Sequence, residues 1–346
     1  MKIESIDISD GKNIANNYKF ITIDERMKPL LVSMKLFGIY FDPWQGRNTL
    51  GQSPNVDKRT STRLQTFFSH RLYCYMVLLL LWFNFVRCSV GIFPLNESLP
   101  LRIILSSWYL QCSFNATIMV VSCQRLSHLR SFYKHWNILF NNNNVTKEID
   151  CGIKYPMKYL KVATSGGWAF FFVTIAAVFA ISLGNLSKLF LDDIVRPFPK
   201  NPWTITLSLI LLIFDTGAWV FPVIFVIVVS RVIKDQFLRL GQILSKQIKE
   251  ADNHIPDSLP ELRSHYTQLC QTVDIINRTF KWILGLSFFL QVFLACFVSY
   301  QMINGPKEMF TTFTYSYWLG GCFLIIISLT RCSSDVHDAV FCQTFK

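Results

Sequence analysis

The sequence predicts an all-α membrane protein, a single bundle of six transmembrane helices with its N-terminus in the cytosol. Apolar residues make up 51% of the 346 residues and charged residues only 16%, whereas a soluble domain carries about a quarter charged residues. Long uncharged runs alternate with basic segments, which is typical of a chain solvated in turn by lipid and by water. The basic residues also gather on one side of the predicted bilayer.

The six predicted spans are recognised by their length and by their lack of charge. A transmembrane helix needs roughly 20 predominantly apolar residues to cross the hydrocarbon layer. The segments that meet this requirement are 72–93, 103–123, 163–187, 203–230, 282–304 and 310–330. Two charged residues lie inside them, Arg87 in the first span and Asp215 in the fourth. The segment before the first span has no apolar run of the kind found in a cleavable signal peptide, so we expect the first span itself to direct insertion.

The direction of the spans follows from the lysine and arginine residues. With the N-terminus in the cytosol, 28 of the 34 basic residues lie on the cytosolic side and 5 on the outer side, while Arg87 lies within a span. Cytosolic loops of membrane proteins carry such an excess. This arrangement places the sequon at Asn96 outside, where we expect glycosylation. It places Asn144 inside, where its sequon is expected to stay unmodified.

The organisation expected from these spans is a cytosolic segment 1–71, a membrane domain 72–330 and a cytosolic stub 331–346. Between the fourth and fifth spans, residues 231–281 carry two apolar stripes at helical spacing, which predicts that both helices extend into the cytosol as a helical hairpin. The stripes could pack only against each other, or they could also form an oligomer core. The residues expected to make this anchor are Phe237, Leu244, Leu262, Leu269, Val273 and Phe280.

No signature of catalysis, metal binding or cofactor binding stands out in the chain. Nucleophile, zinc-protease and P-loop motifs are absent from the sequence, and its six histidines are dispersed. The net charge of +12 comes from residues that flank apolar spans. This pattern indicates attraction to an anionic lipid surface, and we expect no nucleic-acid partner. We therefore predict that the protein is not an enzyme and has no cofactor or metal.

Asp215 and a set of aromatic residues are the candidates for a binding site. Asp215 lies about twelve residues into its span, roughly 18 Å deep, where a carboxylate needs a polar partner or cavity. It could be held by Asn84 or Asn115 of a neighbouring helix, or it could belong to a ligand or ion site. Aromatic residues in the outer halves of the spans could line a pocket for a small amphipathic ligand. The candidate ligand-binding residues are Trp108, Phe179, Asp215, Tyr300, Tyr315 and Trp318.

The chain resembles the invertebrate gustatory receptor superfamily, which is related to the insect odorant receptors. The resemblance lies in segment 29–43, where Phe37-Gly38 is followed by Pro43, and in the run 262–280 before the fifth span. The cytosolic N-terminus and the chain length agree with it. The resemblance implies a plasma-membrane receptor for a small extracellular molecule. It also implies a ligand-gated, non-selective cation channel, assembled as a tetramer with like or related subunits.

The chain departs from the family pattern after the sixth predicted span. The family has a seventh span that lines the pore, whereas this chain ends at Lys346. We expect a fragment, a truncated isoform or a decayed gene product, and no autonomous conduction. The alternatives are a non-conducting subunit that modulates other receptors, and a multipass transporter or lipid-handling membrane protein.

Overall fold

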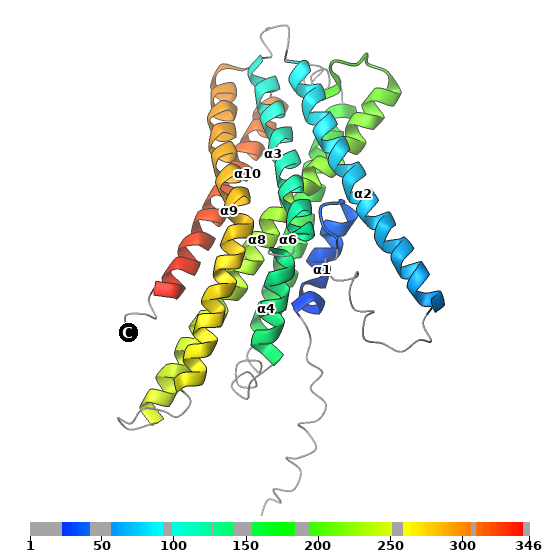
Figure 1. The fold of residues 1–346 in the computed structure, drawn as a ribbon. Coiled ribbons are helices and arrows are strands. Elements are labelled where there is room, and N and C mark those ends of the chain that lie inside the picture. Colours follow the sequence, from blue (N-terminus) through cyan, green and yellow to red (C-terminus); the bar gives the residue numbers. More distant parts are fainter. Residues whose placement is uncertain are drawn as a thin grey trace, which may run out of the picture.

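The computed structural model describes residues 23–41, 57–92, 99–125, 128–141, 154–183, 194–250, 259–305 and 309–341. Throughout these ranges the regular elements are helices, arranged as an elongated bundle (Figure 1). The helices are α1 (Ile23–Leu36), α2 (Asp57–Val90), α3 (Leu99–Gln124), α4 (Leu129–Asn141), α6 (Lys154–Leu183), α8 (Pro202–Glu250), α9 (Leu259–Asn304) and α10 (Met309–Phe341). The predicted all-α class is confirmed for the part of the chain that the structure describes.

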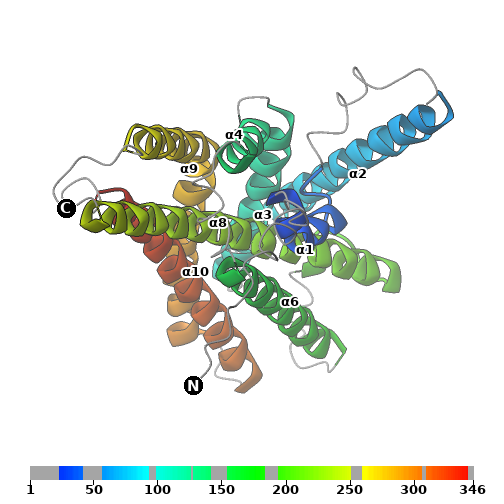
Figure 2. The same ribbon diagram turned by 90° about the horizontal axis from the view of Figure 1, so that it is seen from below.

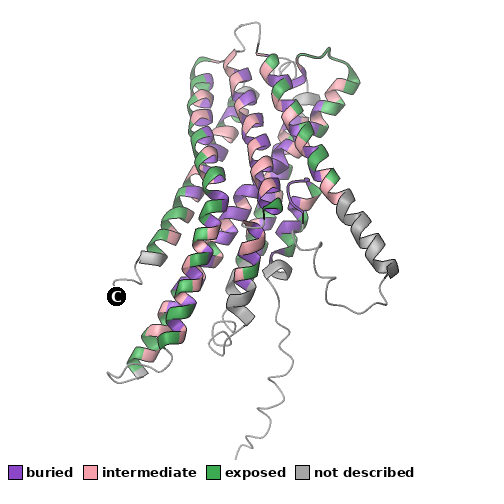
Figure 3. Ribbon diagram, viewed as in Figure 1, coloured by how far each residue is buried: buried purple, intermediate pink, exposed green. Residues whose placement is uncertain are grey.

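Six of these helices, α2, α3, α6, α8, α9 and α10, are long and apolar enough to cross a membrane. They correspond to the six predicted spans. Exposed residues lie along their outer faces (Figure 3), and many of them are large and apolar. On α2 such residues recur every three or four positions, as Leu72, Met76, Leu79, Phe83, Val86 and Val90. A stripe of this kind is the face that a transmembrane helix turns toward lipid.

Helix α8 is the centre of the bundle. It packs against α1, α2, α3, α6, α9 and α10, and the view from below shows it crossing the middle of the bundle (Figure 2). In the apolar 18-residue stretch of α8, 78% of the residues are buried, compared with 28% in the corresponding stretches of α6 and α10. Side chains from α8 are therefore the ones that can meet most of the other helices at once.

The predicted extension of the fourth and fifth spans is present as continuous helix. Helix α8 has 49 residues and α9 has 46, more than twice the roughly 20 needed to cross a bilayer. Their far ends lie side by side (Figure 1), and the rings of Phe237 and Tyr266 meet edge to face at 5.8 Å. Of the predicted anchor residues, Phe237, Leu262, Leu269 and Phe280 are buried, and Leu244 and Val273 are half-buried. Their role in an oligomer stays a prediction.

The N-terminal helix α1 is part of the bundle core, which the sequence pattern alone does not predict. The Phe37 ring lies 5.8 Å from Trp168, 5.1 Å from Phe171 and 5.1 Å from Phe221. Gly38 follows it at φ +65°, a left-handed turn that favours glycine. A Cβ at Gly38 would come within 2.7 Å of Val77 on α2. The Phe-Gly motif therefore turns the chain inside the bundle, between α2 and the two aromatic-rich helices α6 and α8.

The last helix continues beyond the predicted end of its span. Residues 331–341, expected to be a stub, prolong α10 without a break. Asp335 in this extension forms ion pairs with Lys234 at 2.7 Å and with Arg231 at 3.5 Å. These pairs attach the C-terminal part of α10 to α8 just beyond the apolar stretch of both helices.

Candidate ligand-binding site

A small, mainly apolar pocket lies between four helices. Its lining residues are Ile104 and Trp108 of α3, Trp219 of α8, Leu294 and Val298 of α9, and Trp318 and Cys322 of α10. Three of the helices each contribute two residues spaced four apart, and residues at this spacing share one helix face. The pocket therefore forms where these three faces and the central helix α8 meet.

Tryptophan rings dominate the walls of this pocket. The Trp108 ring lies 6.0 Å from that of Trp219, edge to face, and 6.3 Å from that of Trp318. The indole N–H groups of Trp108 and Trp219 are buried and have no hydrogen-bond partner within the described ranges. A buried N–H without an acceptor costs about 1–3 kcal/mol. The pocket thus combines large apolar surfaces with two residues whose indole N–H groups are buried and unpartnered in the described ranges.

A second buried feature connects α2 with α8. Asn84 donates a hydrogen bond of 2.6 Å to Asp215 Oδ2. The amide oxygen of Asn84 accepts hydrogen bonds from Arg87 Nη2 at 2.6 Å and from Arg87 Nε at 3.0 Å. Arg87 Nη1 also donates to the Val195 carbonyl at 3.1 Å and to Ser208 Oγ at 3.3 Å. We call Arg87, Asn84 and Asp215 the polar triad.

The polar triad supplies the partner that the intramembrane carboxylate requires. Of the two amides considered from the sequence, Asn84 holds Asp215, while Asn115 accepts a hydrogen bond from Ser287 Oγ at 3.2 Å. Asp215 is completely buried, and its Oδ1 has no partner among the residues that the structure describes. Asp215 does not line the pocket. It therefore has a structural role in joining α2 to α8, and a ligand role stays a proposal.

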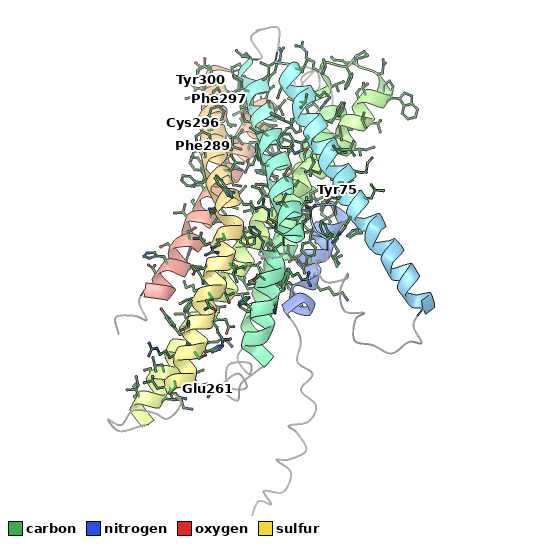
Figure 4. The ribbon with its side chains drawn as sticks, in the orientation of Figure 1. Tyr75, Glu261, Phe289, Cys296, Phe297 and Tyr300 are labelled. Carbon is green, nitrogen blue, oxygen red and sulfur yellow. The ribbon has the colours of Figure 1, made fainter. Side chains whose placement is uncertain are left out.

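The structure brings together two of the six candidate ligand residues. Trp108 and Trp318 line the pocket. Tyr315 is buried one turn before Trp318, while Phe179 is half-buried near the end of α6. Tyr300 is 55% exposed on the outer surface of α9, among the outward-facing side chains labelled in Figure 4. The glycosylation candidate Asn96 lies outside the described residues.

Sequence reasoning missed five residues of the pocket lining, and it did not pair Arg87 with Asp215. The five are Ile104, Trp219, Leu294, Val298 and Cys322. A signal existed for Trp219 and for the pairing of Arg87 with Asp215. Trp219 follows Asp215 by one helical turn, and Arg87 and Asp215 carry opposite charges in otherwise uncharged spans. Aliphatic residues such as Leu294 and Val298 are common in every span, so no local pattern distinguishes pocket from lipid face.

Comparison with known families finds a match for most of the second half of the chain. Residues 178–341, which run from the end of α6 through α10, match the sequence model of a family described as Trehalose receptor. None of the curated proteins matches the sequence. The matched region contributes five of the seven pocket-lining residues.

Solved structures of an insect olfactory receptor share the fold. The structure of OR5 from Machilis hrabei has a TM-score of 0.65 at 15% identity, covering 93% of this chain and 82% of that chain. The structure of OR5 in complex with eugenol has a TM-score of 0.70 at 16% identity, covering 90% of this chain and 80% of that chain. At this identity the likeness concerns the fold alone.

The six helices that are long and apolar enough to cross a membrane indicate a multipass membrane protein, and residues 178–341 are similar to a receptor family. The match covers less than half of the chain, and over most of its length the fold is similar to that of the insect olfactory receptor OR5.

Proposed function

We propose that the chain is a gustatory-type chemoreceptor subunit that detects a small, largely apolar molecule in the pocket between α3, α8, α9 and α10. The subunit resides in the plasma membrane with its N-terminus in the cytosol. It assembles with like or related subunits, as a tetramer, into a ligand-gated, non-selective cation channel. The pocket then lies toward the outer leaflet, because its lining residues are near the ends of α3, α9 and α10 that are remote from the basic residues Arg125, Arg278 and Arg331.

The observation that carries this proposal is the meeting of Trp108, Trp219 and Trp318 around one space. Ligand pockets in proteins are lined mainly by apolar and aromatic side chains, with a few polar groups that fix orientation. Their usual volume is about 300–1,000 Å³. The space left free between the lining side chains is only about 10 Å³, roughly that of one water molecule, so a ring-sized ligand must move these side chains apart.

The pocket chemistry favours such a molecule over a disaccharide such as trehalose. The lining residues offer two unpartnered N–H donors, and all other lining side chains except that of Trp318 are aliphatic or a thiol. A disaccharide carries many hydroxyl groups, and each hydroxyl buried without a partner costs about 1–3 kcal/mol. The name of the matched family therefore does not by itself indicate the ligand of this chain.

The buried and central position of α8 supports coupling between ligand and gate. Trp219 of the pocket and Asp215 of the polar triad lie one turn apart on α8, and Arg231 and Lys234 of the same helix hold α10. A ligand that changes the packing of Trp219 acts on the helix that contacts most of the bundle. Such differential contacts are what a ligand needs in order to shift a conformational equilibrium.

The proposal is tested by ligand binding to the purified chain in lipid nanodiscs. We expect 4-allylphenol, a one-ring amphipathic probe, to raise the unfolding temperature in a saturable manner. Trehalose should give no shift. The variant Val298→Phe, which fills the pocket, should lose the response to 4-allylphenol while retaining a cooperative unfolding transition. Stabilisation by trehalose alone, or an unchanged response in Val298→Phe, would contradict the proposal.

A further inference from the structure

Two buried polar pairs connect α3 with α9 below the pocket. Gln291 Nε2 donates a hydrogen bond of 3.1 Å to Gln111 Oε1, and Ser287 Oγ donates one of 3.2 Å to Asn115 Oδ1. All four side chains are completely buried. We call these pairs the glutamine rung and the asparagine rung.

The rungs lie in one register with the pocket. Helices α3 and α9 are antiparallel, and the paired residues follow the same spacing of four, three and four positions on both. On α3 the residues are Asn115, Gln111, Trp108 and Ile104. On α9 they are Ser287, Gln291, Leu294 and Val298. The last two residues of each series line the pocket. One helical turn rises about 5.4 Å, so the glutamine rung lies one turn below the pocket and the asparagine rung lies two turns below it.

The glutamine rung has unused hydrogen-bonding capacity. Gln111 Nε2, a donor, and Gln291 Oε1, an acceptor, have no partner among the residues that the structure places. Reversing the side-chain amide of a glutamine exchanges the positions of its oxygen and nitrogen. If both amides were reversed, the rung would still keep one free donor and one free acceptor. Together with the indole N–H groups of Trp108 and Trp219, unpartnered polar atoms therefore continue from the pocket into the bundle.

We propose that Gln111 and Gln291, which lie one turn beyond the residues that line the pocket, act as a polar subsite that selects ligands carrying a hydroxyl group on an apolar, ring-sized body. The inference rests on the proposed function, because it concerns the ligand of the same pocket. A hydroxyl group both donates and accepts, so it complements the free donor and the free acceptor at once. A methyl ether can only accept, and a hydrocarbon can do neither.

The test uses three probes that share one body, namely allylbenzene, 4-allylanisole and 4-allylphenol. Their dissociation constants are measured on the full chain in lipid nanodiscs, and empty nanodiscs supply the correction for partitioning into lipid. We expect the phenol to bind about tenfold more tightly than the ether or the hydrocarbon. This ratio corresponds to the binding free energy gained when the phenol satisfies the free donor and the free acceptor.

Two double variants separate the subsite from the general polarity of the bundle. Gln111→Met with Gln291→Met replaces the glutamine rung by apolar side chains of similar shape, a type of change that proteins tolerate well. This variant should bind all three probes and lose the preference for the phenol. Asn115→Leu with Ser287→Ala removes the asparagine rung, two turns from the pocket, and should keep the roughly tenfold preference.

The outcomes distinguish the subsite from the pocket itself. Equal binding of the three probes to the native chain would overturn the subsite while supporting the pocket. A phenol preference that survives in the Gln111→Met and Gln291→Met variant would also overturn it. Saturable binding of none of the probes to the native chain would overturn the proposed function, and the subsite with it.

Discussion

Asn84 of α2 donates a 2.6 Å hydrogen bond to Asp215 of α8, while its own amide oxygen accepts two hydrogen bonds from Arg87. One neutral side chain thus bridges the two charged residues that the sequence places inside the spans. A charged group inside a membrane is costly unless it is paired. The polar triad therefore ties the first span to the central helix and should be sensitive to the loss of any single member.

The first prediction concerns this dependence. Removing the guanidinium with Arg87→Met leaves Asp215 and Asn84 buried without their counterpart, and should lower the free energy of unfolding by about 3 kcal/mol. Replacing Arg87 and Asp215 together, by Met and Leu, removes both charges and should cost less than the single change. Thermal unfolding in detergent measures both values. The single change Asp215→Leu completes the cycle, and a loss in the double variant equal to the sum of the two single losses would show that the triad is not an energetic unit.

The second prediction concerns the turn after α1. Gly38→Ala forces a side chain into a left-handed conformation and against Val77. The expected loss is about 1–3 kcal/mol of folding stability. Gly166 in α6 is the matched control, because a Cβ there meets nothing within 4 Å. Gly166→Ala should be neutral or stabilising by up to about 1 kcal/mol. Equal unfolding temperatures for the two variants would show that α1 does not dock as described.

The third prediction concerns the extended ends of α8 and α9. Leu269→Asp places a carboxylate at a buried position and should cost several kcal/mol, seen as lost expression or assembly. Gln271→Asp, at an exposed position of the same helix, is the control and should behave like the native chain. Size-exclusion chromatography of both variants supplies the measurement. Normal yield and size for Leu269→Asp would exclude a buried seam at this position.

The fourth prediction concerns orientation. An epitope inserted near Ser53 should be detected only after permeabilisation of cells, and one near Asn96 should be detected in intact cells, because 28 of 34 basic residues lie on the N-terminal side of the bilayer. Endoglycosidase treatment should shift the native band, and the shift should be reduced in Asn96→Gln and unchanged in Asn144→Gln. Labelling near Ser53 in intact cells would reverse the orientation.

Composition and periodicity were sufficient to predict the main features of the fold. Hydropathy identified the six spans because each must present about 20 apolar residues to lipid, and apolar stripes predicted that α8 and α9 continue as helices. The depth of Asp215 required a polar partner, and the sequence offered Asn84 as one of two candidates. Span length, apolar stripes and the depth of a residue are properties of a single helix, so they can be predicted from the sequence.

The remainder depends on how the helices are tilted and rotated against each other. Trp108, Tyr300 and Trp318 all lie in the outer halves of their predicted spans. In the structure Trp108 and Trp318 line the pocket together with Trp219, whereas Tyr300 is directed outward. The docking of Phe37 near Gly217 and Trp168 joins residues more than a hundred positions apart. No spacing rule within one helix contains that information.

The central claim, that a small molecule binds among Trp108, Trp219 and Trp318, is tested most directly by photolabelling. A diazirine derivative of 4-allylphenol is irradiated with the chain in lipid nanodiscs, and labelled residues are located by mass spectrometry. Binding in the pocket predicts labelling of its lining residues on α3, α8, α9 and α10, suppressed by excess 4-allylphenol. Labelling confined to outward-facing residues such as Phe289 and Tyr300, unaffected by the competitor, would contradict it.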